Sequence, residues 1–324
     1  MSPVLPPFPV AAVEAGHTLA KVLRSRLGGP SWNEVRKLVT ARRVQVGDAV
    51  CSDEARRLKE GELVTLLPEP KPLPRSAHAE RLVVRHLDEH VVVVEKPSGV
   101  NTVRHPAELA WAEDRRALDP TLEDLTQWAV AHRLKRPAKS LSRLRIVHRL
   151  DKETSGLVVF ARSVLAEREL GLQFRKHTVV RRYLTLVPGY LAAGTIRSSL
   201  VRDRGDGRRG STTLPDVGKV AVTHVTIEER LKRFTLLSCR LETGRTHQIR
   251  IHLSESGHHV CGDKVYNRTR DGVEISEDSG APRLALHAIE LGFRHPASEA
   301  DLHWVMELPP DLQKLLARHR AKAP

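Results

Sequence analysis

Cysteine is scarce in this sequence, and the cysteines that occur are not paired by spacing. Only three are present in 324 residues: Cys51, Cys239 and Cys261. Neither a disulfide framework nor a cysteine-based zinc site is indicated, and we expect a protein of the reducing cytoplasm. His258 and His259 stand near Cys261 but lack the separated ligand pairs of structural zinc, so we expect no metal.

The N-terminal segment lacks the features of a targeting or membrane-spanning segment. Residues 1–13 have no early lysine or arginine, are interrupted by prolines and are too short to span a bilayer. We therefore expect residues 1–15 to form a disordered tail, and we expect no membrane partner.

Acidic residues are too few to balance the basic ones. Lysine and arginine number 53 against 39 aspartates and glutamates, which gives a net charge of +14. Such an imbalance predicts nucleic acid as the first candidate partner and an anionic membrane as the second. The distribution favours nucleic acid, because residues 133–182 hold fourteen Lys or Arg against four acids and surround Asp151.

Residues 16–67 have the pattern of a small domain. Apolar residues at helical spacing precede a break at 28–30, and a second helix is expected after Ser31, with Glu34 completing a capping box. Strands are expected near 44–48 and 62–67. Four basic residues on or just after the second helix are expected to bind phosphates without selecting a sequence: Arg36, Lys37, Arg42 and Arg43. An ordinary amphipathic domain is the alternative.

A proline-rich linker at residues 68–80 is expected to separate this domain from a larger one at 81–318, with a short tail at 319–324. A helix at 122–135 would be capped by Thr121 and Asp124, and another would begin after Ser163 and end near 176. The expected strands are 82–87, 91–94, 179–187, 220–228, 234–241, 284–293 and 302–307, and a last helix is expected at 311–319. The basic, glycine-rich segment 203–219 is expected to be a mobile loop.

The segment 148–161 places one carboxylate inside the basic region. Apolar residues precede Asp151, and the apolar residues 157–160 after it predict a buried strand. Residues 154–156, Thr-Ser-Gly, favour a turn between them. Asp151 is therefore expected to project from a rigid strand-to-turn corner, where catalytic groups are often found. The alternative is a structural aspartate that pairs with neighbouring arginines.

This segment, with the sequence HRLDKETSGLVVFA, resembles the signature of the RluA-type (ribosomal large-subunit type) pseudouridine synthases. The similarity continues in a D-E-x-apolar-K-P-x-G opening at 88–99, in T-G-R-T-H-Q-I-R-x-H at 243–252, and in two further patterns, Gly257, Gly262, Asp263 and Tyr266, then Arg283, Leu286, His287 and Ala288. It covers about residues 81 to 310. It implies an α+β fold, with a mixed, mainly antiparallel sheet and flanking helices, preceded by a small α/β domain similar to the αL RNA-binding motif.

The resemblance also implies a reaction and a set of site residues. The enzymes isomerise a uridine of RNA to pseudouridine without a cofactor, and Asp151 would be the catalytic aspartate that attacks or triggers detachment of the base. Tyr183 would lie against the base, although a packed strand tyrosine is the alternative, and Arg250 would pair with Asp151. Arg149 would fill the stack left by the flipped uridine, and Ile251 would lie beside the base. Further substrate-binding residues would be Arg245, His247 and Gln248.

Pattern alone leaves the segment 246–256 open between a strand and a helix that Thr246 caps and Gly257 ends; following the family, we expect the helix. Two other functions are considered: an RNA-binding ribosome-assembly factor without turnover, and a glycosidase. A glycosidase needs a second carboxylate nearby, and Glu153 lies on the wrong side of a turn. We expect a cytoplasmic monomer whose partner is RNA, ribosomal RNA first and transfer RNA second, without a protein partner.

Overall fold

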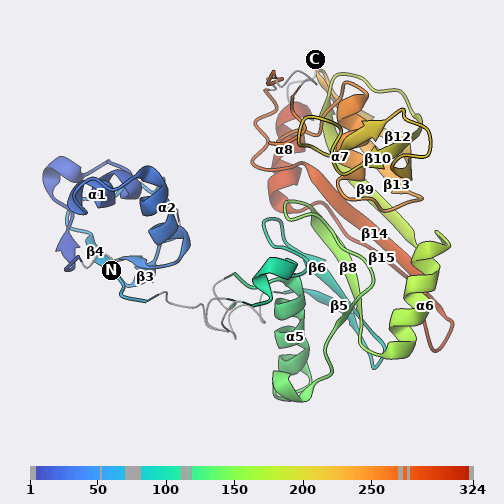
Figure 1. Ribbon diagram of the computed structural model, residues 1–324, viewed down its shortest axis with the longest axis horizontal. Coiled ribbons are helices and arrows are strands. Elements are labelled where there is room, and N and C mark those ends of the chain that lie inside the picture. Colours follow the sequence, from blue (N-terminus) through green and yellow to red (C-terminus); the bar gives the residue numbers. More distant parts are fainter. Residues whose placement is uncertain are drawn as a thin grey trace. The chain divides into compact units, whose positions relative to one another are not determined.

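The computed structural model describes residues 5–51, 53–69, 82–110, 116, 119–268, 273–275 and 278–320. The chain divides into a small unit, Met1–His78 with Arg104–Pro120, and a large unit, Ala79–Val103 with Thr121–Pro324. Both appear in the ribbon of Figure 1. Most of the expected linker, residues 70–80, lies outside the described residues. The segment 104–120, which we expected within the larger domain, groups with the small unit.

In the part of the small unit that the structure describes, two α-helices combine with a four-stranded sheet. Its helices are α1 (Leu19–Arg26) and α2 (Trp32–Thr40), and its strands, in sheet order, are β1 (Phe8–Pro9), β4 (Leu63–Leu66), β2 (Val44–Val46) and β3 (Ala49–Val50). The predicted capping box is confirmed: Ser31 Oγ accepts from Glu34 N at 3.3 Å, and Glu34 Oε2 accepts from Ser31 N at 2.8 Å. Apolar residues of both helices and of the sheet share one core.

The prediction of a disordered tail is wrong for residues 5–15. Phe8 and Pro9 form β1, which pairs with Val64 and Leu63 of β4, and Ala12–Glu14 form a short 3-10 helix. Phe8 and Val10 are 8% and 2% exposed. Burying two such side chains stabilises the folded state by about 1.5–3 kcal/mol each. The partner strand lies far along the chain, so local composition does not reveal this gain.

The large unit is built on an eleven-stranded sheet. Along its main path the order is β11-β10-β12-β13-β9-β14-β8-β6-β5, while β15 pairs with β14 and β7 with β8. The strands are β5 (Val84–Leu87), β6 (Val91–Lys96), β7 (Arg145–Ile146), β8 (Ser155–Ala161), β9 (Val180–Pro188), β10 (Gly194–Val201), β11 (Gly210–Thr212), β12 (Lys219–Arg230), β13 (Phe234–Leu241), β14 (Leu286–Arg294) and β15 (Asp301–Val305). Between described strands the pairs are antiparallel except β14–β8, so the expected mixed, mainly antiparallel sheet is confirmed.

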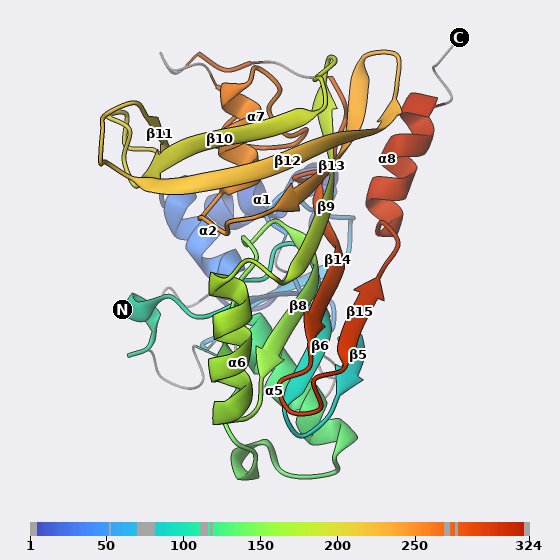
Figure 2. The ribbon, with the colours of Figure 1, turned by 90° about the vertical axis from the view of Figure 1, so that its right-hand side faces the viewer.

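Strand β14 joins two half-sheets, one that ends at β9 (β11-β10-β12-β13-β9) and one that begins at β8 (β8-β6-β5). It runs antiparallel to β9, with Ala288 opposite Tyr183, and parallel to β8, with Ala288 opposite Gly156. Figure 2 shows β14 between the two. A Cβ on Gly156 would lie 2.2 Å from the Ala288 carbonyl oxygen, and its φ is +126°. Only glycine permits this close approach of the two backbones.

Helices cover both faces of the half-sheet that contains β6 and β8. The helices of this unit are α5 (Leu122–Arg133), α6 (Val164–Arg175), α7 (Gln248–Glu255) and α8 (Pro310–Arg320), with a 3-10 helix at Ala138–Ser140. Leu170 of α6 packs with Val93 and Val159, whereas Leu122 of α5 packs with their neighbours on the opposite face. This burial on both sides explains why β6 and β8 are apolar without alternation.

The local signals for helices and turns have mixed outcomes. The capping of α5 by Thr121 with Asp124 and of α6 by Ser163 is confirmed. The segment 246–256 is a helix, α7, but its N-cap is His247 and not Thr246. The expected loop 203–219 contains strand β11, which pairs with β10, and is corrected to that extent.

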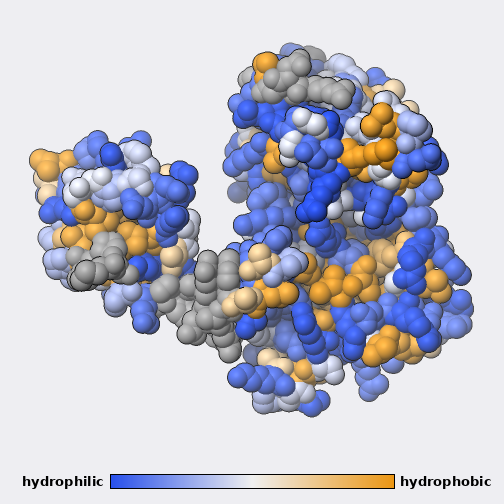
Figure 3. Space-filling view, in the orientation of Figure 1, coloured by the Kyte–Doolittle hydropathy of each residue, from blue (hydrophilic) through white to orange (hydrophobic). Residues whose placement is uncertain are grey.

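The surface of the large unit in Figure 3 is largely hydrophilic, with smaller hydrophobic areas between. Within the part of the chain that the structure describes, no helix combines the length and the apolar character needed to cross a bilayer.

Candidate active site

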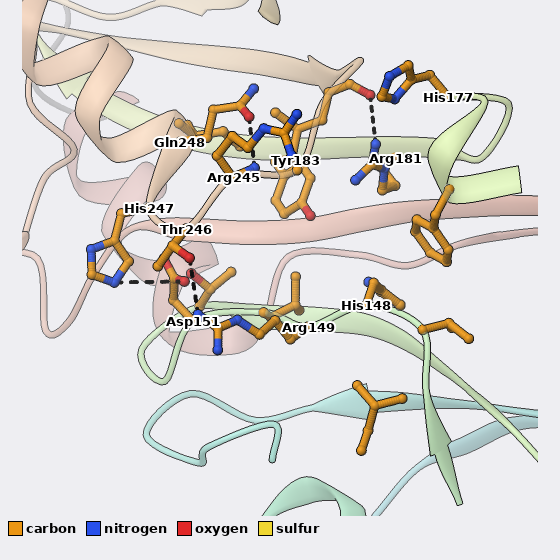
Figure 4. Close-up of a pocket in the computed structure, with 18 of the residues that line it drawn as sticks. His148, Arg149, Asp151, His177, Arg181, Tyr183, Arg245, Thr246, His247 and Gln248 are labelled. Carbon is orange, nitrogen blue, oxygen red and sulfur yellow. Dashed lines mark hydrogen bonds and ion pairs between the residues drawn. The ribbon is translucent and has the colours of Figure 1, made fainter. Parts of the chain in front are cut away.

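A cavity of about 690 Å³ opens in the large unit between the loop before β8, strand β9, helix α6 and the start of α7. This volume is in the range of ligand-binding pockets. The cavity brings together seven of the residues expected at the site: Arg149, Asp151, Tyr183, Arg245, His247, Gln248 and Arg250. In Figure 4, Asp151 and His247 lie toward one end, His148, Arg181 and His177 toward the other, and Tyr183 between them.

Asp151 stands in a loop that the protein holds at several points. Thr102 Oγ1 donates to the Leu150 carbonyl at 2.7 Å and accepts from its N–H at 3.1 Å. One Asp151 oxygen lies 3.6 Å from Arg250 Nη1, and the other lies 3.9 Å from His247 Nε2. Both separations are longer than a hydrogen bond, so the carboxylate faces positive charge while its oxygens remain accessible from the cavity.

Lys96 also holds this loop through hydrogen bonds to its backbone. Its ammonium group donates to the carbonyls of Pro97, Lys152 and Thr154 at 2.9, 2.8 and 2.7 Å. Burial lowers the pKa of Lys96 to about 7. In the sequence, Lys96 belongs to the K-P opening, and the pattern there does not indicate a role for it. The structure shows that it fixes the backbone on either side of Glu153, directly after Asp151.

Arg250 is held more tightly by another carboxylate than by Asp151. Its Nε and Nη2 donate to the two oxygens of Asp263 at 2.7 and 2.8 Å. Burial alone would lower the pKa of Arg250, but the bond to Asp263 raises it overall. Asp263 also accepts from the backbone N–H groups of Val265 and Tyr266. Nη1 is the nitrogen of Arg250 that lies nearest to Asp151.

Tyr183 projects from β9 into the cavity and is buried. Burial raises the pKa of Tyr183 to about 12, and the nearby Asp151 charge acts in the same direction. The phenol is therefore protonated at neutral pH. It offers a flat ring and an O–H group, but no phenolate.

Residues at the mouth of the cavity connect the loop before β8 with the start of α7. Arg149 is exposed, and its Nη2 donates to Thr246 Oγ1 at 3.2 Å. His247 has a left-handed backbone, φ +59°, and its Nδ1 lies 2.8 Å from the Tyr266 hydroxyl. Burial lowers the pKa of His247, although the Asp151 charge opposes this. Arg245 donates from Nε to the Val220 carbonyl at 3.0 Å.

Two expected substrate-binding residues do not have the expected surroundings. Ile251 is 1% exposed, does not line the cavity, and packs with Leu200, Ala221 and Tyr266. Successive helix residues point about 100° apart, so turning Arg250 toward the cavity turns Ile251 away from it. Gln248 lines the cavity, but its amide is fully occupied: Oε1 accepts from Thr243 Oγ1 and Arg245 N, and Nε2 donates to Val222 O and Thr223 Oγ1.

The four basic residues expected to bind RNA in the small unit are placed differently from one another. Arg36 is exposed and pairs with Glu54 at 3.0 Å, and Lys37 is exposed on the same helix. Arg42 has a left-handed backbone just after α2. Arg43 donates from Nε to the Leu67 carbonyl at 2.9 Å, which links the residue before β2 to the residue after β4.

The arrangement around Asp151 does not supply a second free acid. Glu153 is exposed and lies outside the cavity. Glu167 lines the cavity but pairs with Arg145 at 2.6 Å. The two-carboxylate chemistry of a glycosidase is therefore not available among the residues that line this cavity.

The chain is similar to known proteins over most of its length. Residues 90–255 match the family described as RNA pseudouridylate synthase. A ribosomal large subunit pseudouridine synthase D of Zymomonas mobilis is 36% identical over 93% of each chain, and one of Nitrosomonas europaea is 34% identical over 96% of this chain and 85% of that protein. The solved structure of human RNA pseudouridylate synthase domain containing 4 shares the fold, with a TM-score of 0.60, 23% identity, and coverage of 76% of this chain and 97% of that one.

The fold and the matched residues define an RNA-modifying isomerase. More narrowly, the chain belongs to the RNA pseudouridylate synthase family, and the resemblance found in the sequence is confirmed.

Proposed function

We propose that this protein isomerises a uridine in large-subunit ribosomal RNA and that Asp151 is the catalytic residue. The observation that carries the proposal is the accessible Asp151 carboxylate, which faces Arg250 Nη1 at 3.6 Å inside a basic cavity. The names of the relatives support the choice of RNA. The same proposal includes a monomer that acts in the cytoplasm, with residues 16–67 as the RNA-binding domain and 81–318 as the catalytic domain.

The reaction conserves every atom of the substrate. The bond from the ribose carbon to the base nitrogen breaks, and a bond from that ribose carbon to a carbon of the uracil ring forms. The ring carbon loses a proton and the freed nitrogen gains one, so no co-reactant is consumed. Asp151 either attacks the ribose carbon or assists elimination of the base.

Arg250 and Tyr183 are proposed to act directly beside Asp151. Arg250 places a fixed positive charge near the carboxylate, and Asp263 keeps that guanidinium in place. Tyr183 provides a face on which a flipped uracil stacks, and its protonated hydroxyl is suited to relaying a proton. Arg149, exposed at the mouth, is proposed to fill the space that the uridine leaves in the RNA.

The small unit is proposed to hold phosphates. Lys37 and Arg36 extend from the exposed face of α2, and the exposed pair of Arg36 with Glu54 is weak enough to exchange for a phosphate. Such contacts raise affinity without choosing the uridine.

The test is to map pseudouridines in large-subunit ribosomal RNA from cells with and without the protein, and then to assay the purified enzyme. Asp151→Asn is expected to abolish isomerisation while RNA affinity stays within a few fold, because the carboxylate performs chemistry and the basic surroundings bind RNA. Asp301→Asn, at an exposed position of β15, is the matched control and should retain activity. Near wild-type turnover by Asp151→Asn would refute the assignment, and a wild-type protein that binds RNA without modifying it would favour the assembly-factor alternative.

A further inference from the structure

Arg181 is a buried guanidinium without an acidic partner. It lies on β9, two residues before Tyr183 and on the same face of the strand, and is 8% exposed. Its Nη2 donates to the carbonyls of Leu241 and Glu242 at 3.4 and 3.1 Å. Its Nε is buried without a hydrogen-bond partner. Within the described part of the chain, no Asp or Glu forms an ion pair with it.

A buried charge without a counter-ion is costly, because neither carbonyl dipoles nor an aromatic face replace its hydration fully. The ring of Phe174 lies 5.4 Å from the guanidinium carbon and offers only a weak attraction. The next residue, Arg182, is partly exposed and yet pairs with two carboxylates, those of Glu290 and Glu228. The protein thus supplies acids to the more exposed arginine and none to the buried one.

The surroundings of Arg181 keep this end of the cavity positive. His148 Nε2 accepts from the Val159 N–H at 3.1 Å, so the proton of its neutral ring is on Nδ1. Burial, with the Arg181 charge as a second cause, lowers the pKa of His148 to about 3. Arg175 and His177 lie exposed along the same end of the cavity. The carboxylate that lines this end, Glu167, is paired with Arg145.

Space for the guanidinium depends on a glycine. A Cβ on Gly244 would lie 2.8 Å from Arg181 Nη1, so a side chain at this position would compete with the guanidinium. Gly244 belongs to the loop that leads into α7 and Arg250. The loop that brings Arg250 to Asp151 therefore also leaves Arg181 room to face the cavity.

We propose that this end of the cavity is an anion site, in which Arg181 binds a backbone phosphate of the RNA next to the target uridine. The planar guanidinium offers a fork of N–H groups that matches phosphate oxygens. Residues two apart on a strand are separated by about 7 Å, so a phosphate on Arg181 adjoins a base on Tyr183. The identification of the anion as an RNA phosphate rests on the proposed function. The affinity of the site for RNA can nevertheless be measured without turnover.

The test compares Arg181→Gln with wild type for binding of short single-stranded oligouridylate over a range of salt concentrations. Loss of one phosphate contact should weaken binding about tenfold at low salt and make the log–log salt slope shallower by about 0.7. Arg318→Gln on the exposed face of α8 removes the same charge away from the cavity and should leave both quantities close to wild type. A slope and affinity for Arg181→Gln equal to those of Arg318→Gln would overturn the proposal.

Two further measurements cover the case in which Arg181→Gln does not fold. Arg181→Lys keeps the charge, so it should keep the wild-type salt slope while losing part of the affinity. Oligouridylate with methylphosphonate linkages lacks backbone charge, so wild type and Arg181→Lys should bind it equally. A difference that persists on the neutral backbone would show that Arg181 acts through structure or base contact, and would also overturn the proposal. A shallower salt slope for Arg181→Gln, together with unchanged RNA binding by Asp151→Asn, separates the phosphate site from the catalytic role of Asp151.

Discussion

The pair of Arg250 with Asp263 provides a quantitative test of how burial governs the energy of an ion pair. The Asp263 side chain is 0% exposed and that of Arg250 is 7% exposed. Asp263→Asn would place an amide N–H₂ where Arg250 requires an acceptor, and would leave the buried guanidinium with only the more distant Asp151 carboxylate, 3.6 Å from Nη1, as a neighbouring acid. Breaking such a pair costs about 3–5 kcal/mol, out of a total stability of about 5–15 kcal/mol. We expect the free energy of unfolding to fall by that amount.

The assay is urea unfolding followed by tryptophan fluorescence, since Trp128 and Trp304 pack against the hydrophobic clusters of the large unit. The matched control is Glu229→Gln, which removes a carboxylate that Arg320 Nε approaches at 2.9 and 3.0 Å, but in a pair whose side chains are 32% and 54% exposed. The control should lose no more than about 1 kcal/mol. Equal losses for the two variants would refute the argument from burial.

Three further predictions concern catalysis, RNA affinity and pH. Tyr183→Phe keeps the ring, so it should bind RNA normally but turn over more slowly in a single-turnover assay; equal rates would leave Tyr183 a stacking role only. A shortened chain that begins at Leu82 should modify the same uridine, yet its salt slope should be shallower by about two units, as for roughly three lost phosphate contacts; an unchanged slope would exclude phosphate binding by the small unit. His252 and His287 are buried, and burial lowers the pKa of each to about 4, so the unfolded chain binds more protons between pH 4 and 6.5. The contribution of these two groups to the free energy of unfolding is therefore fully present above pH 6.5 and should fall on acidification, by up to about 2.7 kcal/mol per pH unit. The check is to measure unfolding at pH 6.5 and at pH 5 for wild type and for the variant with both histidines replaced by glutamine.

Features that depend on neighbouring residues could be predicted from the sequence. The capping boxes of α2 and α5 need only residues three apart, and the hairpin of β12 and β13 needs only a short turn. Each of these features is formed by residues close together in the sequence, so local conformational propensity is enough to predict it. The turn after Asp151 was expected at Thr-Ser-Gly 154–156, and this position is wrong: the turn lies at residues 152–153, where the Thr154 N–H donates to the Asp151 carbonyl at 3.1 Å, while Ser155 and Gly156 already belong to β8.

Features that depend on how elements dock could not be predicted in this way. The burial of Phe8 requires a partner strand more than fifty residues away. The orientation of Ile251 depends on how α7 is rotated on the sheet, which the spacing of its residues does not specify. Asp263 appeared as one letter in a glycine-containing pattern, and its bond to Arg250 is set by the path of the loop after α7.

The position of β14 has a consequence for the time at which the enzyme becomes active during its synthesis. Asp151 belongs to the half-sheet with β8, whereas Tyr183 and Arg250 belong to the half-sheet with β9, and β14 follows all three along the chain. A nascent chain that lacks β14 has two separate half-sheets, each with an unpaired edge that is open to wrong partners. The ribosome must therefore translate past Arg294 before the aspartate and its arginine can meet, so a growing chain cannot modify RNA while this strand is still being made.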